Sequence, residues 1–168
     1  MGKVLMSSHA LPRPHHPRAL AQLLVMMVLA AGLVLAGPAG DASAASTTKV
    51  RNATNIALNQ KGDPYRYGAA GPGAFDCSGL IYYSYRKAGI SVPRTSGQQA
   101  AHARRIAKGN MRRGDLMFFH NGGRVYHAAI FLGWKDGRAQ LLHSPRSGSR
   151  VHVTRTWTTQ WFGGTLRG

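Results

Sequence analysis

Apolar positions recur at a helical period in the first segment for which the sequence predicts regular structure. Between Thr47 and Gly62, Val50, Ala53 and Ile56 follow the spacing of an amphipathic helix. Gly62 is typical of a helix end. The same reasoning predicts two further helices, at residues 77–88 and 98–107.

The period changes after residue 114, where short apolar runs alternate with turn residues. Asn121-Gly122-Gly123 and Asp136-Gly137 are hairpin signals. Strands are therefore predicted at residues 115–120, 125–132, 139–143, 150–156 and 161–166. Helices followed by hairpin-linked strands predict one small α+β domain, with N-terminal helices packed on an antiparallel sheet of about five to six strands.

The N-terminal region has the layout of a secretory signal peptide. An uncharged apolar run at residues 20–36 follows a positively charged stretch and precedes the small residues 42–45. We expect residues 1–44 to be a signal peptide that is removed near Ala44 or Ala45. The mature protein would then consist of a helix at 45–60 and a main domain at 61–168, exported to the cell wall or medium without a stable membrane anchor. An uncleaved membrane anchor is the alternative.

The chain is strongly basic, and it contains no glutamate. It has 22 Lys and Arg against 5 Asp and Glu, a formal net charge of +17. Such an excess suits nucleic acid or an extracellular anionic polymer. The export signal and the scattered arginines argue against nucleic acid. We expect contact with anionic wall polymers, although a merely soluble surface would give the same composition.

Cys77 is the only cysteine, so no disulfide can form within the chain. An odd cysteine in an exported protein indicates a reactive thiol or an intermolecular bridge, and an inert buried thiol is the alternative. Cys77 lies at the first turn of a predicted helix, where free N–H groups and the helix dipole favour a thiolate. It is therefore a candidate nucleophile.

Two histidines can serve this cysteine as base and orienting group. His127 begins one apolar strand and His143 ends the next, so antiparallel pairing brings both to the same end of the sheet. A zinc site formed by Cys77, His127 and His143 is an alternative, but the spacing of known zinc motifs is absent. The remaining histidines of the main domain are assigned to ordinary core or surface positions: His102, His120 and His152.

Six segments resemble, in order, the motifs of the NlpC family of papain-like cysteine peptidases of the bacterial cell wall. They are Gly62–Gly68, Phe75–Ile81, Val92–Gln99, Arg113–Phe119, Tyr126–Gly133 and Leu142–Pro145. One departure is Ala128-Ala129, where the family usually has Val-Gly. The resemblance implies a papain-like fold for residues 61–168.

The resemblance also implies catalytic roles. Cys77 would be the nucleophile, His127 the general base and His143 the orienting residue. Tyr65 would complete an oxyanion hole with the backbone N–H of Cys77. Hydrolysis would pass through a thioester, with no metal or cofactor.

The implied substrate is a peptidoglycan stem peptide, cut between D-glutamate and the following diamino acid by a monomeric enzyme. Asp76 and Ser78 would line the pocket for the end of the stem peptide, and Asp76 also suits a helix N-cap. Alternatives are a non-catalytic wall-binding module of the same fold, an amidase, and a secreted toxin acting on another wall bond.

Overall fold

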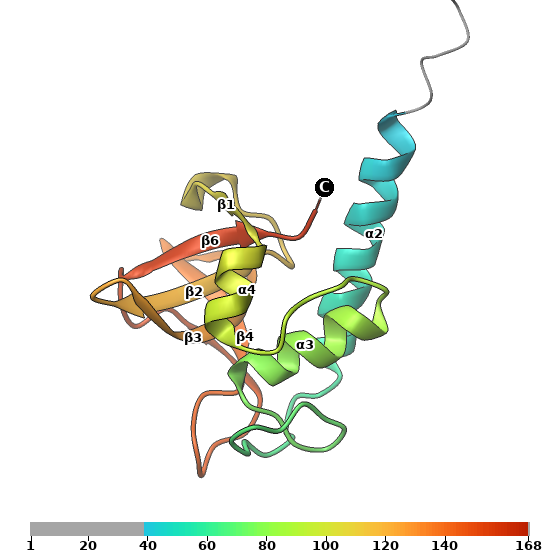
Figure 1. The fold of residues 1–168 in the computed structure, drawn as a ribbon. Helices are drawn as coiled ribbons and strands as arrows, with labels where there is room; N and C mark the ends of the chain where they lie inside the picture. The colour runs from blue at the N-terminus through green and yellow to red at the C-terminus, as the bar shows by residue number, and fades with distance from the viewer. Residues whose placement is uncertain (1–38, 168) are drawn as a thin grey trace, which may run out of the picture. The chain divides into compact units, whose positions relative to one another are not determined.

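An antiparallel sheet of six strands packs against helices on one of its faces (Figure 1). The computed structural model describes residues 39–167. Its helices are α2 (Ala39–Leu58), α3 (Cys77–Lys87), α4 (Ser96–His102) and the short 3₁₀ helix η1 (Lys108–Asn110). Its strands are β1 (Arg104–Ile106), β2 (Leu116–Asn121), β3 (Arg124–Lys135), β4 (Arg138–His143), β5 (His152–Arg155) and β6 (Trp161–Thr165). The predicted α+β class is confirmed.

The strands follow the order β1-β6-β2-β3-β4-β5 across the sheet. Tight hairpins join β2 to β3 and β3 to β4, as the turn signals predicted. Asp136 and Gly137 between β3 and β4 have φ values of 50° and 72°, which the primed hairpin turns require. β3 is the longest strand described, and it pairs with β2 on one side and with β4 on the other. It carries His127, and its neighbour β4 carries His143.

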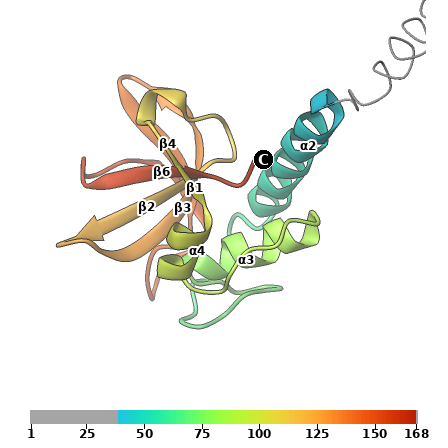
Figure 2. The ribbon, with the colours of Figure 1, turned by 45° about the horizontal axis from the view of Figure 1, so that its top comes forward.

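Each face of the sheet has its own apolar cluster, because successive side chains point to opposite faces. Phe118, Ala128 and Ile130 pack with α2 and α3, and both views place these helices on the same side of the sheet (Figure 2). Phe119 and Phe131 belong to the cluster on the opposite face. His127 precedes Ala128 and therefore faces the side of the sheet that these helices do not cover.

The first helix begins earlier and ends earlier than predicted. α2 starts at Ala39 and ends at Leu58, and its residues Val50, Ala53 and Ala57 are buried. The predicted cleavage near Ala44 falls within α2, and residues 1–38 of the predicted signal peptide lie outside the described residues. In the range 39–167, no helix has the length and apolar character needed to cross a bilayer.

The prediction of one helix over residues 98–107 was wrong at both ends. Thr95 caps α4 through a capping box with Gln98, so the helix begins at Ser96. Residues 104–106 instead form β1, which pairs with β6 at an edge of the sheet. Local sequence favoured a continued helix, and pairing with a distant strand overrode it.

Candidate active site

Cys77 is the first residue of α3, and most of the backbone N–H groups around it have a hydrogen-bond acceptor. Asp76 N–H donates to the carbonyl oxygen of Ala69 at 2.9 Å, and Gly79 N–H donates to the Asp76 carboxylate at 2.6 Å. The backbone N–H of Ser78 acts on the adjacent Cys77 sulfur and helps to lower the pKa of the thiol. Of the four N–H groups that a helix start leaves unpaired, that of Cys77 remains for an incoming oxyanion.

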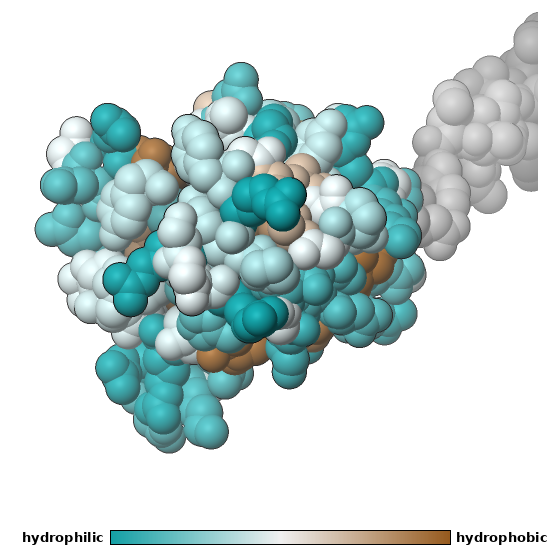
Figure 3. All heavy atoms as spheres, turned by 90° about the horizontal axis from the view of Figure 1, so that it is seen from below, coloured by the Kyte–Doolittle hydropathy of each residue, from teal (hydrophilic) through white to brown (hydrophobic). Residues whose placement is uncertain are grey.

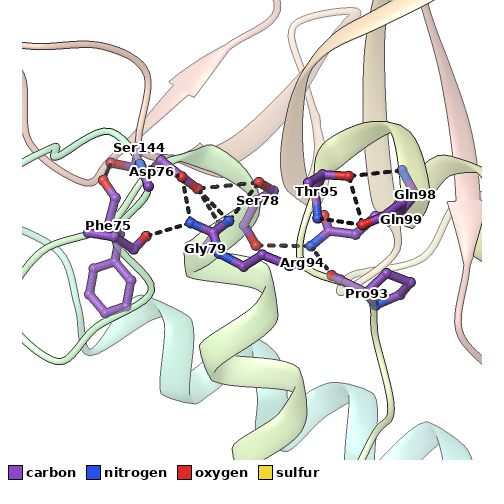
Figure 4. A network of polar contacts seen from close by, with 12 residues as sticks. Phe75, Asp76, Ser78, Gly79, Pro93, Arg94, Thr95, Gln98, Gln99 and Ser144 are labelled. Atoms are coloured by element: carbon purple, nitrogen blue, oxygen red, sulfur yellow. Dashed lines mark hydrogen bonds and ion pairs between the residues drawn. The ribbon is translucent and has the colours of Figure 1, made fainter.

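Asp76 is more than a helix cap. Its carboxylate accepts from Gly79 N–H as predicted, and also from Gly68 N–H at 2.9 Å. Arg94 forms an ion pair with the same carboxylate at 2.6 Å and contacts the Ser78 hydroxyl at 3.1 Å (Figure 4). Asp76, Ser78 and Arg94 therefore form one network at the start of α3, and the sequence analysis had not singled out Arg94.

Gln99 is a second residue that the sequence analysis missed. Its buried side-chain amide donates to the carbonyl oxygens of Ser78 and Pro93, each at 2.9 Å (Figure 4). It therefore joins α4 to the first turn of α3. A buried glutamine inside an amphipathic helix is out of pattern, and that is the signal that could have identified it.

The two candidate histidines meet as the antiparallel pattern predicted. Ile130 pairs with Leu142, so the register places His143 opposite Ala129, and His127 lies two residues further along the same face. Nε2 of His127 lies 3.0 Å from Nδ1 of His143. Both rings are buried.

The thiol and the histidine pair are brought together by contacts across the fold. The backbone N–H of Ala128, the residue after His127, lies close enough to the Cys77 sulfur to help lower the pKa of the thiol. The Ser144 hydroxyl, next to His143, donates to the carbonyl oxygen of Phe75 at 2.7 Å. These contacts tie the strands that carry the imidazoles to the segment that carries the nucleophile.

Cys77 and His127 line one open pocket of about 560 Å³, together with Tyr65, Asp76, Ser78 and Arg94. Cys77 itself is partly exposed there. Desolvation and the nearby Cys77 and Asp76 raise the pKa of the Tyr65 hydroxyl, which keeps it protonated and able to donate. The structure thus places every predicted site residue except His143 on this pocket, with His143 directly behind His127.

Burial shifts the pKa values of both Cys77 and His127 toward their neutral forms. Desolvation raises the pKa of the Cys77 thiol, and Asp76 adds to this, against the hydrogen bonds from Ala128 and Ser78. Desolvation also lowers the pKa of His127 to about 4. Burial thus opposes the thiolate that the helix start favours, and it also disfavours the charged form of the His127 imidazole.

Trp157 accounts for part of this desolvation. Its ring stacks on Phe119 with centroids 4.5 Å apart, and it lies 5.9 Å from the His127 ring and 5.5 Å from the His143 ring. Trp157 therefore covers the histidine pair from the side away from the helices. Its position in a turn between two strands gave no sequence signal for this role.

Acid should destabilise the fold through these buried rings. In the unfolded chain His127 has its ordinary pKa of 6.5, whereas in the folded protein its pKa is lowered to about 4. As the pH falls through this interval the unfolded state binds more protons, so the free energy of unfolding should drop by about 3 kcal/mol from this ring alone. Urea unfolding at a series of pH values measures the drop. A His127→Gln variant should lose less over the same interval, and an equal loss would contradict the prediction.

The zinc alternative gains no support from this geometry. The nitrogens of His127 and His143 point at each other at hydrogen-bond distance rather than toward a shared centre. Within residues 39–167, no three His, Cys, Asp or Glu side chains form a group suited to hold a metal ion.

Comparisons with known proteins identify relatives of this chain. A family model described as "NlpC/P60 family" matches residues 62–166. Murein DD-endopeptidase MepH of Escherichia coli is 34% identical over 132 residues, which cover 73% of this chain and 47% of that protein. A probable endopeptidase of Corynebacterium glutamicum (strain R) is 37% identical over 115 residues, covering 68% of this chain and 52% of that protein. The chain thus spans about half the length of these relatives.

Solved structures show the same similarity. The peptidoglycan hydrolase RipB from Mycobacterium tuberculosis superposes with a TM-score of 0.65 and 27% identity, over 91% of this chain and 87% of that one. The P60 domain of an antigen from M. avium subspecies paratuberculosis gives a TM-score of 0.64 and 29% identity, over 73% of this chain and 98% of that one.

Proposed function

This chain belongs to the NlpC/P60 family, and we propose that it is a cysteine endopeptidase that hydrolyses amide bonds in the stem peptides of peptidoglycan. The observation that carries the proposal is the meeting of three groups: a cysteine at a helix start, a histidine on the same pocket, and a second histidine 3.0 Å behind the first. Relatives named as an endopeptidase and as a peptidoglycan hydrolase support the substrate class.

The reaction proceeds by acyl transfer to sulfur. Cys77 loses its proton to Nδ1 of His127 as the sulfur attacks the amide carbonyl, because desolvation disfavours the charged form of each group before substrate binds. The backbone N–H of Cys77 and the protonated hydroxyl of Tyr65 stabilise the oxyanion. His127 then donates its proton to the leaving nitrogen, the C–N bond breaks, and a thioester remains.

Water completes the cycle. Neutral His127 removes a proton from a water molecule that attacks the thioester, and the returning proton regenerates the Cys77 thiol. His143 accepts the Nε2–H of His127 throughout, which keeps the ring oriented and stabilises the positive charge it carries between steps.

The bond between D-glutamate and the diamino acid is our proposed point of cleavage. Asp76, Ser78 and Arg94 form a polar wall of the pocket next to the nucleophile, suited to hold the charged end of a short peptide. A second candidate is cleavage of the D,D cross-link, because the E. coli relative is named a DD-endopeptidase.

Mass spectrometry of digested peptidoglycan should distinguish these bonds. Cleavage after D-glutamate should leave dipeptide stems on the sugars and free a new amine on the diamino acid. Cleavage of cross-links should convert dimers into monomers with full-length stems, and an amidase should release whole stems from the sugar. Unchanged muropeptides would contradict the proposed function and favour a binding module.

We also propose that the enzyme acts outside the cell, held near anionic wall polymers by the 19 Lys and Arg against 4 Asp in residues 45–168, a formal net charge of +15. Figure 3 shows the face that is lowest in Figure 1; it is mostly hydrophilic, with apolar residues in small patches only. The excess of basic residues suits loose electrostatic retention, which added salt should weaken.

A further inference from the structure

Three histidine rings form a hydrogen-bonded chain that runs outward from the catalytic base. His127 contacts His143 at 3.0 Å, and Nε2 of His143 lies 3.3 Å from Nε2 of His152. Nδ1 of His152 lies 2.7 Å from the carbonyl oxygen of Arg150, which is the last group of this hydrogen-bonded series. The contact follows from the register, since His143 and His152 are direct partners across β4 and β5. His152 lies exposed on the edge strand β5, as expected for an ordinary edge residue, and it also contacts His143.

When all three rings are neutral, the carbonyl oxygen of Arg150 fixes the direction of each hydrogen bond between them. A carbonyl oxygen only accepts, so Nδ1 of His152 must carry a proton. In that neutral state Nε2 of His152 carries no proton, so it accepts from Nε2–H of His143. His143 in turn accepts at Nδ1 from Nε2–H of His127. His127 consequently keeps its lone pair on Nδ1, the nitrogen that the mechanism needs as base.

The terminal carbonyl is itself held in place. Arg150 forms a β-bridge with Pro64, and its guanidinium donates to the carbonyl oxygen of Gly62 at 2.7 Å. The next residue, Val151, exchanges backbone hydrogen bonds of 2.8 and 2.9 Å with Asp63 and Gly62. The carbonyl oxygen of Arg150, which accepts from His152, is thus held against residues 62–64, the segment that leads to Tyr65 and the nucleophile.

We propose that His152 is a positioning residue of this active site, which fixes the tautomer of His143 and through it the tautomer of His127. His152 touches no reacting atom. The inference rests on the proposed function, and it adds a fourth residue behind the triad. A second histidine alone leaves the direction of the His127–His143 bond undetermined, because an imidazole can donate or accept at either nitrogen.

The test compares two substitutions that differ in hydrogen-bonding ability. His152→Phe keeps a ring but removes the acceptor, whereas His152→Gln keeps an oxygen that can accept from His143 and an amide that can donate to Arg150. We expect His152→Phe to lower kcat on soluble muropeptides about 10-fold with little change in KM, as for loss of one hydrogen bond. His152→Gln should stay within about 3-fold of the parent. His102→Phe, at an exposed histidine outside the site, is the matched control.

A spectroscopic readout separates this proposal from the proposed function. Long-range ¹H–¹⁵N spectra of the histidine rings at neutral pH should show protons on Nε2 of His127, Nε2 of His143 and Nδ1 of His152. In His152→Phe the first two rings should become tautomer mixtures. Unchanged tautomers in that variant, or a Gln variant as impaired as the Phe variant, would overturn the positioning role. Absence of hydrolysis in the unmodified protein would overturn the function alone, because the spectra need no turnover.

Discussion

Replacing Cys77 with alanine should lower peptidoglycan hydrolysis by at least about 10⁴-fold, the scale on which removal of a catalytic nucleophile acts. The chain contains no second cysteine that could substitute. Because Cys77 is partly exposed and lies at the helix start rather than in an apolar cluster, the variant should remain folded. Release of new amine groups from purified peptidoglycan measures the activity.

The stability of that variant provides the control. Alanine keeps the backbone N–H groups at the start of α3 and leaves the Asp76 cap intact. Its urea-unfolding midpoint should therefore stay close to that of the parent. A folded Cys77→Ala protein that still digests peptidoglycan would contradict the nucleophile assignment.

Gly79→Ala should be the most damaging change to the geometry of the site. A Cβ at this position would lie 2.0 Å from the carbonyl oxygen of Ala69 and 2.9 Å from the Asp76 carboxylate. Alanine favours a helix by about 1 kcal/mol over glycine, but displacing packed backbone costs about 3 kcal/mol or more. We expect a net loss of at least about 2 kcal/mol in the free energy of unfolding and, because the first turn of α3 must shift, a drop in kcat of about 10²-fold.

Gly97→Ala is the matched control for this change. Gly97 also lies in the first turn of a helix, α4, but a Cβ there would meet nothing within 4 Å. That variant should be as stable as the parent, or more stable by up to about 1 kcal/mol, with unchanged activity. Equal effects of the two substitutions would show that close approach to Ala69 does not constrain the site.

The sequence predicted the parts of the site that depend on local pattern. His127 and His143 could be placed together because hairpin signals define which strands pair and in which direction. Cys77 could be placed at a helix start because a glycine-rich loop precedes it and a helical period follows. Both predictions use only short-range information and the rule that antiparallel neighbours meet end to end.

The missed residues are those whose role depends on pairing across long sequence distances. Arg94 reaches Asp76 only because α4 packs beside α3, and Trp157 covers the histidines only because its turn folds over β3 and β4. His152 contacts His143 because of the register between β4 and β5. The sequence did not predict this register, since the form of the segment between the two strands could not be predicted. The desolvation that raises the pKa of Cys77 was also beyond the sequence, since it depends on how the folded chain packs around the thiol.

The central claim, that hydrolysis depends on one thiol, is tested most directly by titrating the protein with iodoacetamide. Intact-mass spectrometry counts the adducts, and a single adduct at a thiol can only lie on Cys77. We predict that residual peptidoglycan hydrolysis falls in proportion to the alkylated fraction and reaches zero at one adduct per chain, while a chelator has no effect. Hydrolysis that persists in fully alkylated protein would contradict the account.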